Sequence, residues 1–316
     1  MTFPPLSPRP DRRTAPRTVT PLSLPALDGH EWLKFPLNQA QLDALVTAAL
    51  REDEAFHDIT TTSVVRSDRR ARATLVARGH GILAGVPLAL EAFRLLDPKV
   101  SIRVDADDGM RVAPDVPVFF VNGHARGILS AERVALNFMQ HLSGIATLTS
   151  KYVEAVRGTG ARIFDTRKTL PGWRTLEKYA VRAGGGANHR LDLASGVLIK
   201  DNHLAACDGR IDQTIRRARE LAPPGTKVEV ECESIEQVEV ALSAGADLIL
   251  LDNMTLNELA ACVALAKGHA IIEASGGISL ETVRAIAETG VDRISVGKLT
   301  HSAPALDLAL DFQPTP

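Results

Sequence analysis

Two short segments of this chain combine residue types that bind anions. Arg167 and Lys168 stand side by side after an apolar run, and three glycines at 184–186 precede His189 and Arg190. Neighbouring cations hydrogen-bond carboxylates or phosphates, and glycines let the backbone approach a ligand closely. An exposed Arg-Lys pair is often only a solvated face. Its position after an apolar strand favours anion binding here.

Three further charged residues each end a short apolar run: Lys200, Glu231 and Asp252. A lysine at the end of a buried strand needs an anion to neutralise it, either a ligand or a carboxylate of the neighbouring strand. Carboxylates at the same edge suit ribose hydroxyls or Mg²⁺, although they also serve as counter-ions for nearby cations. Glu229 points to the same side of its strand as Glu231 and competes with it for the metal.

Two glycine-containing segments predict a phosphate site. Ser275, Gly276 and Gly277 follow one apolar run, and Gly297 and Lys298 follow the next. Barrels bind phosphate after their last two strands, through glycine amides and the start of a short helix. The five cations Arg133, Arg167, Lys168, Arg190 and Lys200 outnumber Glu231 and Asp252, so the ligand should carry several negative charges.

These residues require a parallel sheet to bring them together. After residue 160, short apolar runs alternate with amphipathic segments, which is typical of βα units whose strand ends meet at one edge. The expected strands are 162–164, 197–199, 227–230, 248–251, 270–274 and 293–296. Six strands are too few for an eight-stranded barrel. Either a short strand lies near 187–193 or the barrel is incomplete.

The first half of the chain has a different pattern. Residues 1–30 hold seven of the 18 prolines and no apolar period, which predicts a disordered leader. An amphipathic helix is expected over 38–54 with Asn38 as its N-cap. Four strands, 71–78, 82–85, 100–104 and 116–121, and a helix at 87–96 predict an α+β layer. Two bridging helices should follow, the first from Ser130 to a C′ glycine at Gly144 and the second ending near residue 157.

The composition excludes several classes of protein. The chain has 316 residues, a net charge of −2 and only 4% aromatic residues, which argues against a nucleic-acid-binding protein. Its three cysteines show neither zinc-site nor disulfide spacing, so a reducing cytoplasm is the expected location. No apolar run approaches the ~18 residues that would span a membrane.

An ordered series of motifs resembles quinolinate phosphoribosyltransferases, the decarboxylating nicotinate-nucleotide pyrophosphorylases of NAD synthesis. The similarity extends over about residues 38–312. The runs that carry it are 57–61, 143–147, 165–172, 176–180, 184–190, 198–203, 228–231, 250–253, 273–277 and 295–297. Two features depart from the family pattern: the proline-rich leader, and Lys298 in place of a small residue.

The resemblance implies the architecture and the assembly. It implies an α+β N-terminal domain over 31–143, an incomplete α/β barrel of six or seven strands over 144–298, and a return of 299–316 to the first domain. It also implies a homodimer, or a higher oligomer, in which the N-terminal domain of one subunit covers the barrel mouth of the other. No nucleic acid or membrane partner is expected.

The resemblance also assigns roles to residues. It implies that Arg133 of the neighbouring subunit, Arg167, His189 and Arg190 bind the quinolinate carboxylates. Lys168 and Lys200 would bind phosphoribosyl pyrophosphate, whose ribose hydroxyls and Mg²⁺ would contact Glu231 and Asp252. Lys168, Lys200, Glu231 and Asp252 form the expected catalytic set. The remaining substrate-binding residues are Thr166, Ser275, Gly276, Gly277, Val296, Gly297 and Lys298.

Three alternatives remain open at this point. A phosphoribosyltransferase for nicotinate or another aromatic acid would share most of the motifs. A Schiff-base aldolase or lyase would use Lys200 as its nucleophile. A phosphosugar-binding protein would bind the same ligand without turnover.

Overall fold

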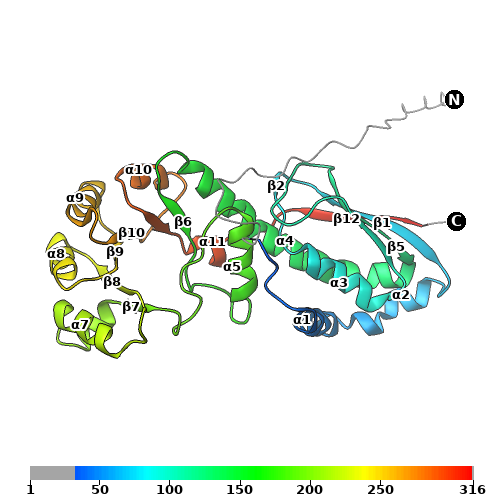
Figure 1. Ribbon diagram of the computed structural model, residues 1–316. Helices are drawn as coiled ribbons and strands as arrows, with labels where there is room; N and C mark the ends of the chain where they lie inside the picture. Colours follow the sequence, from blue (N-terminus) through cyan, green and yellow to red (C-terminus); the bar gives the residue numbers. More distant parts are fainter. Residues whose placement is uncertain (1–32, 315–316) are drawn as a thin grey trace, which may run out of the picture.

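A six-stranded parallel sheet forms the larger lobe of the protein, for which a computed structural model describes residues 33–314 (Figure 1). Its strands pair in the order β6-β11-β10-β9-β8-β7. Their bounds are β6 Arg162–Phe164, β7 Val197–Ile199, β8 Val228–Cys232, β9 Leu248–Asp252, β10 Ile271–Ser275 and β11 Arg293–Ser295. The helices of this lobe are α5 Arg174–Ala183, α6 Asp201–Ala205, α7 Ile211–Leu221, α8 Ile235–Ser243, α9 Leu256–Ala266, α10 Val283–Glu288 and α11 Lys298–His301.

The barrel is incomplete, as one of the two sequence alternatives proposed. Within the described chain, the segment 187–193 contains no strand and contributes one parallel bridge, between Ala187 and Phe164. Ala187 donates its N–H to Ile163 O at 2.8 Å, and Asp165 donates to Ala187 O at 3.1 Å. The segment then leaves the sheet, because Asn188 Nδ2 and the backbone N–H of His189 donate to the Asp165 carboxylate instead of to a neighbouring strand.

An antiparallel sheet forms the smaller lobe, with the order β12-β1-β5-β3. Its strands are β1 Arg70–Ala77, β3 Ser101–Val104, β5 Pro117–His124 and β12 Leu308–Pro314. The C-terminal strand β12 lies at the edge of this sheet, where it pairs with β1 over seven residues. The expected strand at 82–85 is wrong: only Gly81–Ile82 (β2) is extended, and it pairs with Arg111–Val112 (β4) in a separate two-stranded sheet.

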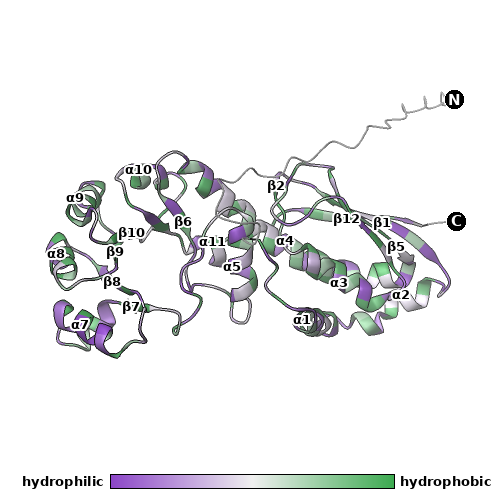
Figure 2. Cartoon of the chain, viewed as in Figure 1, coloured by the Kyte–Doolittle hydropathy of each residue, from purple (hydrophilic) through white to green (hydrophobic). Residues whose placement is uncertain are grey.

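The helices of the smaller lobe are α1 Gln39–Glu52, η1 Ala55–His57, α2 Ile59–Val64 and α3 Val86–Leu96. Two of them, α1 and α3, lie where the sequence predicted helices, whereas η1 and α2 were not predicted. Asn38 caps α1 through a reciprocal pair of hydrogen bonds with Gln41, each 3.0 Å long, which satisfies two backbone donors. Helix α3 begins with proline in its first turn, is largely buried, and carries much of the apolar sequence in this lobe (Figure 2).

One continuous helix, α4 (Ala125–Ala155), joins the lobes where two helices were expected. Ser130 lies inside it and donates to Asp58 Oδ2 at 2.8 Å, so it caps nothing. Gly144 also lies inside it. A Cβ at Gly144 would overlap Pro304 O and crowd Ala305 Cα. The glycine therefore leaves room for the backbone of 304–305 to pass across α4, and it does not end a helix. That crossing carries the C-terminus back to the smaller lobe, with Leu306 N donating to Gln140 O at 3.0 Å.

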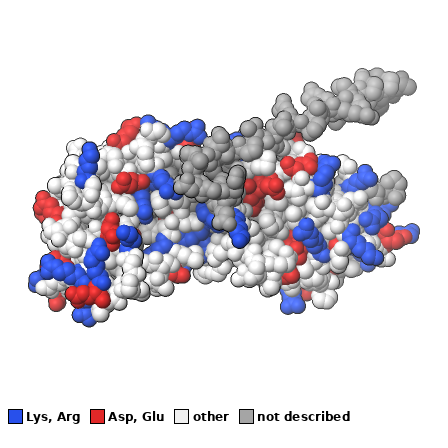
Figure 3. Space-filling model, viewed as in Figure 1, with Lys and Arg blue, Asp and Glu red and all other residues white. Residues whose placement is uncertain are grey.

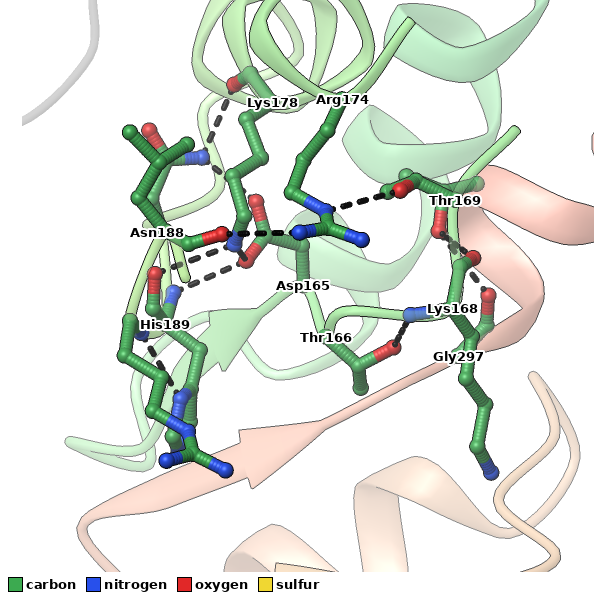
Figure 4. A network of polar contacts seen from close by, with 12 residues as sticks. Asp165, Thr166, Lys168, Thr169, Arg174, Lys178, Asn188, His189 and Gly297 are labelled. Atoms are coloured by element: carbon green, nitrogen blue, oxygen red, sulfur yellow. Dashed lines mark hydrogen bonds and ion pairs between the residues drawn. The ribbon is translucent and has the colours of Figure 1, made fainter. Parts of the chain in front are cut away.

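A buried ion pair fixes the loop that follows β6 and the segment that follows α5 (Figure 4). Lys178 of α5 contacts Asp165 at the end of β6, and both side chains are almost fully buried. Lys178 Nζ also donates to His189 O at 3.0 Å. Asp165 accepts from Asn188 Nδ2 at 2.6 Å and from His189 N at 2.8 Å. The pair therefore holds the backbone that presents His189 and its neighbour.

The cost of burying these charges shows in their pKa values. Burial raises the pKa of Asp165 and lowers the pKa of Lys178, in spite of the contact between them. Burial of an ion pair seldom increases the free energy of unfolding, whereas loss of one partner lowers it because the other charge is left unpaired. The pair therefore specifies the geometry of the loop more than it stabilises the fold.

Two expectations lie outside this description. The leader at 1–30 falls on residues that the structure does not describe, and the domain limits of 31–143 and 144–298 stay predictions. Within residues 33–314, no helix is both long enough and apolar enough to cross a membrane.

The first prediction concerns the crossing at Gly144. Alanine favours a helix over glycine by about 1 kcal/mol, but at Gly144 its methyl group would displace the backbone of Pro304, so Gly144→Ala should destabilise the protein by ~1–3 kcal/mol. Urea unfolding measures the difference. Gly196→Ala is the control, because a Cβ there meets nothing within 4 Å. A Gly144→Ala protein as stable as the wild type would contradict this packing.

The second prediction concerns the buried pair. Lys178→Met keeps the length of the side chain and leaves Asp165 buried without its cation, so the protein should lose ~3–5 kcal/mol of stability. Arg66→Met breaks the exposed pair with Asp68, which water and salt screen, so its cost in stability should be far smaller. Equal losses in the two variants, measured by thermal or urea unfolding, would show that Lys178 is not specially placed.

Candidate functional site

The carboxyl ends of the parallel strands align, so the charged residues identified in the sequence share one edge of the sheet. Ile199 pairs with Val230, which sets Lys200 level with Glu231. Ser275 pairs with Asp252 on the next two strands. Ligands of parallel sheets bind beyond this edge, because backbone amides, loops and side chains converge there. The register therefore assembles the predicted strand-end set.

Lys200 and Glu231 form an ion pair between the ends of β7 and β8. This contact is the neighbouring-strand salt bridge that the sequence offered as one explanation of Lys200. The Glu231 side chain is only 10% exposed, whereas that of Lys200 is 44% exposed. The ammonium group is thus open to a ligand on one side while it neutralises a nearly buried carboxylate on the other.

Asp252 is held in place by the residue that follows it. Asn253 Nδ2 donates to Asp252 Oδ2 at 2.8 Å, and Asn253 has a left-handed backbone with φ of 55°. Its side chain lies against Gly276, where any Cβ would overlap it, and Gly276 itself has φ of 90°. Glycine is therefore required at Gly276 both by backbone conformation and by space.

The loops after β6 and β11 meet at the same edge. Thr300 Oγ1 donates to Lys168 O at 2.7 Å, and Lys168 N donates to Thr166 Oγ1 at 3.0 Å. The Lys168 side chain extends past Gly297, whose added Cβ would lie 3.0 Å from Lys168 Cδ. Val296 is buried, whereas Lys168 and Lys298 are exposed. The two predicted anion-binding segments are therefore one surface.

Two guanidinium groups lie near each other with incomplete pairing. Arg167 Nε is buried and has no hydrogen-bond partner among residues 33–314. Arg190 Nη1 donates to Gly196 O at 3.0 Å, and burial, followed by the charge of Arg167, lowers the pKa of Arg190. A buried donor and two mutually repelling cations favour an anionic ligand. On the face shown in Figure 3, both signs of charge are interspersed.

His189 is turned toward the sheet interior. Its Nε2 lies 3.1 Å from Glu229 Oε2 and 3.6 Å from Glu273 Oε1, and its Nδ1 accepts the N–H of Arg190 at 2.8 Å. Glu229, considered in the sequence only as a competing metal ligand, thus contacts the imidazole. Among the described residues, His189, Glu229 and Glu273 form a group of three whose potential ligand atoms all lie within 4.8 Å of one another.

Arg133 lies apart from the other site residues of its own chain. It is exposed on α4 and lines a surface depression with Asp53, Glu54, Ala55, His57, Asp58, Ile59, Leu129 and Ser130, all from the smaller lobe. Within the described residues it forms no hydrogen bond or ion pair with a strand-end residue. The single chain therefore does not bring Arg133 to the cationic cluster.

Sequence reasoning missed the residues that support the site from below. Lys178, Asn188 and Glu273 were not assigned roles. A signal was present in α5, where Glu177 and Lys178 are buried among apolar neighbours. Glu177 accepts from Leu170 N at 3.2 Å and contacts His141 Nε2 at 2.9 Å, which ties the 166–172 loop to α4.

Comparisons with known proteins agree with this geometry. The chain matches the family described as "Quinolinate phosphoribosyl transferase", with the N-terminal domain over residues 58–143 and the C-terminal domain over 145–311. It is 44% identical to the nicotinate-nucleotide pyrophosphorylase [carboxylating] of Mycobacterium leprae, over 87% of this chain and 100% of that protein. It is 40% identical to the human enzyme of the same name, over 89% of this chain and 94% of that one.

Solved structures show the same relationship. The nicotinate-nucleotide pyrophosphorylase of Francisella tularensis superposes with a TM-score of 0.82 at 38% identity, covering 88% of this chain and 99% of that one. NadC from Streptococcus pyogenes gives a TM-score of 0.85 at 41% identity, covering 89% and 99%. With both domains matched in order and the strand-end residues assembled at one edge, this chain belongs to the quinolinate phosphoribosyltransferase family.

Proposed function

We propose that the protein transfers the phosphoribosyl group of phosphoribosyl pyrophosphate to quinolinate, with decarboxylation, in NAD biosynthesis. The products are nicotinate mononucleotide, pyrophosphate and carbon dioxide. The observation that carries this proposal is the cationic strand-end surface in a chain of this family. It combines an arginine pair with a separate lysine and glycine surface, which suits one dicarboxylate and one polyphosphate.

The quinolinate subsite is assigned to the arginine side of this surface. Arg167 and Arg190 would each receive a carboxylate, and Arg133 of a second subunit would complete the set. The orphan Nε of Arg167 supports this assignment, because a carboxylate would supply the missing acceptor. His189 lies beside Arg190 in the same segment.

The phosphoribosyl pyrophosphate subsite is assigned to the lysine and glycine side. Lys168 and Lys200 supply fixed positive charge, and Thr166 supports the Lys168 amide. Ser275, Gly276, Gly277, Val296, Gly297 and Lys298 surround the place proposed for the 5′-phosphate. Glu231 and Asp252 would take the ribose hydroxyls.

Mg²⁺ is the proposed metal, and Glu231 and Asp252 would hold it. Mg²⁺ is usually bound by one or two carboxylates together with substrate phosphates and water, which fits two carboxylates on neighbouring strand ends better than a closed protein cage. When bound, it would stabilise negative charge on the departing pyrophosphate.

The proposed chemistry needs no protein nucleophile. The bond from ribose C1 to the pyrophosphate oxygen breaks, and the pyridine nitrogen forms a bond to C1. Lys168 and Lys200 stabilise the charge on the leaving group, and the arginines hold the ring in line. The positively charged ring then accepts the electron pair of its adjacent carbon–carboxylate bond. Carbon dioxide leaves and a proton replaces it.

We also propose a homodimer with shared sites, in the cytoplasm. The depression around Arg133 contains no other site cation, so this arginine needs a second subunit to act. Ile59, which lines it, and Phe56 and Val64 of the adjoining η1 and α2 are exposed apolar residues of the kind that subunit interfaces cover. All three cysteines are free, which suits a reducing compartment.

A lyase mechanism remains the competing reading for Lys200. A Schiff-base lysine must reach a carbonyl carbon with its amine nitrogen, whereas Lys200 Nζ is engaged by Glu231 at the end of the neighbouring strand. The pair supports the assignment of Lys200 as a fixed cation.

The third prediction tests the substrate. With phosphoribosyl pyrophosphate and Mg²⁺, quinolinate should yield nicotinate mononucleotide, carbon dioxide and pyrophosphate. Nicotinate lacks one carboxylate, and loss of one charge-assisted contact costs ~2–5 kcal/mol, so its kcat/KM should be lower by about 30-fold to several thousand-fold. Equal kcat/KM values would refute the diacid assignment. Borohydride trapping of a substrate on Lys200 would instead support the lyase.

The fourth prediction tests the shared site. Arg133→Ala and Lys168→Ala should each abolish activity as homodimers. In a mixed dimer one site carries both changes and the other carries neither, so co-refolded variants should recover roughly a quarter of wild-type activity. Each variant refolded alone is the control. Recovery no higher than these controls would mean that Arg133 serves its own chain.

A further inference from the structure

The segment that follows Arg190 has little apolar anchoring. No residue from 187 to 198 is buried, and residues 191–195 are all exposed. Lys178 holds this segment only as far as the carbonyl of His189. A segment with few buried apolar contacts opens easily unless hydrogen bonds restrain it. The position of Arg190, one of the arginines assigned to quinolinate, therefore depends on individual polar contacts.

Arg174 joins this segment to the loop that carries the other arginine of the same chain. Its Nε donates to Thr169 Oγ1 at 3.0 Å, and its Nη1 donates to Leu191 O over a longer distance, 3.4 Å (Figure 4). Thr169 lies two residues after Arg167, and Leu191 directly follows Arg190. One guanidinium thus connects the two segments that present the quinolinate arginines.

The charge of Arg174 does not explain this placement. Among residues 33–314, no carboxylate forms an ion pair with it. Burial lowers the pKa of Lys178, and the nearby charges of Arg174 and Arg167 lower it further, against the opposite effect of Asp165. Three cations therefore lie close together. A lysine would supply the same charge, but only the planar guanidinium donates in two fixed directions, so its shape accounts for the bridge.

The bridge affects how two carboxylates are held at once. A rigid acid with carboxylates on adjacent ring carbons gains both ion pairs only if Arg167 and Arg190 keep a fixed separation, whereas a monocarboxylate needs only one arginine. Lys168 is restrained separately, because its carbonyl accepts from Thr300 and its amide donates to Thr166. Binding of phosphoribosyl pyrophosphate should therefore depend little on the bridge.

We propose that Arg174 is a positioning residue that sets the separation of Arg167 and Arg190, and so makes the subsite selective for two adjacent carboxylates over one. It acts through the Thr169 hydroxyl on one side and the Leu191 carbonyl on the other, without contacting the ligand. This inference rests on the proposed function, because it concerns the subsite assigned to quinolinate.

Binding of phthalate and benzoate to the full-length protein tests the bridge without turnover. Phthalate has two adjacent carboxylates and benzoate has one, and neither has a ring nitrogen that could react. In Arg174→Met, titration calorimetry should show the Kd of phthalate rising about three- to tenfold and that of benzoate changing less than about twofold. Arg174→Lys should recover little of the loss, because one ammonium does not reproduce the fork.

These titrations separate the inference from the proposed function. A wild-type protein that binds the two acids equally would contradict the diacid subsite itself, and the inference with it. A wild-type preference for phthalate that persists unchanged in Arg174→Met, or that Arg174→Lys fully restores, would overturn the positioning role alone.

A change in the partner of Arg174 distinguishes positioning from ligand contact. Thr169→Val keeps the shape of the side chain, removes the acceptor of Arg174 Nε and leaves the guanidinium in place. It should weaken phthalate binding as Arg174→Met does, and the double variant should be no worse than either, because both changes break one link. Additive losses, or wild-type binding by Thr169→Val, would mean that Arg174 contacts the ligand and would overturn the inference.

Arg217→Met is the matched control, because Arg217 is exposed on α7, outside both segments, and its loss should change neither Kd. Thermal unfolding of each variant shows whether weaker binding reflects a damaged fold. Kinetics give the same contrast: in Arg174→Met the KM for quinolinate should rise while the KM for phosphoribosyl pyrophosphate does not. Equal rises in both KM values would indicate general loosening of the site and contradict the inference.

Discussion

The buried pair of Lys178 and Asp165 is the interaction on which the rest of the site depends. Asp165 ends β6 and accepts hydrogen bonds from Asn188 and from the His189 backbone, while Lys178 reaches the same segment from α5. A glycine-rich segment has many accessible conformations, and its entropy opposes a fixed geometry. Buried charged groups are stable only where hydrogen bonds and opposite charges replace water, so the Lys178–Asp165 pair favours one conformation of this segment. The position of Arg190 follows from it.

A second constraint sets how the lobes are connected. Helix α4 runs through the boundary between them, and the chain crosses it at Gly144 before forming β12 (Figure 1). Tyr179 of α5 donates to Asp108 of the smaller lobe at 2.6 Å, which adds a polar link across the same boundary. A smaller lobe tied at several points presents the Arg133 surface as a rigid unit, which suits the proposed role toward a second subunit.

Charge in the site is arranged in layers. Lys200–Glu231 and Lys178–Asp165 are neutralised within the protein, whereas Nε of Arg167 is buried without a hydrogen-bond partner in the described part of the chain. Beneath them lie the carboxylates of Glu229 and Glu273. The layer that meets the proposed ligand is therefore cationic, and the layer below it is acidic.

The sequence by itself determined the parallel strands, their charged ends and the family, because apolar period and motif order are local properties. The sequence alone predicted that Asn38 caps a helix and that strands end near Lys200 and Glu231. Tertiary structure alone decided three features. Gly144 lies where the chain crosses α4, because the backbone of Pro304 packs against it. The strand β12 takes a place in the antiparallel sheet and the expected strand at 82–85 does not, because this pairing joins segments that are far apart in sequence. His189 faces Glu273 because residues 84 apart in sequence meet inside the parallel sheet. Each depends on contacts between distant segments, which local patterns do not encode.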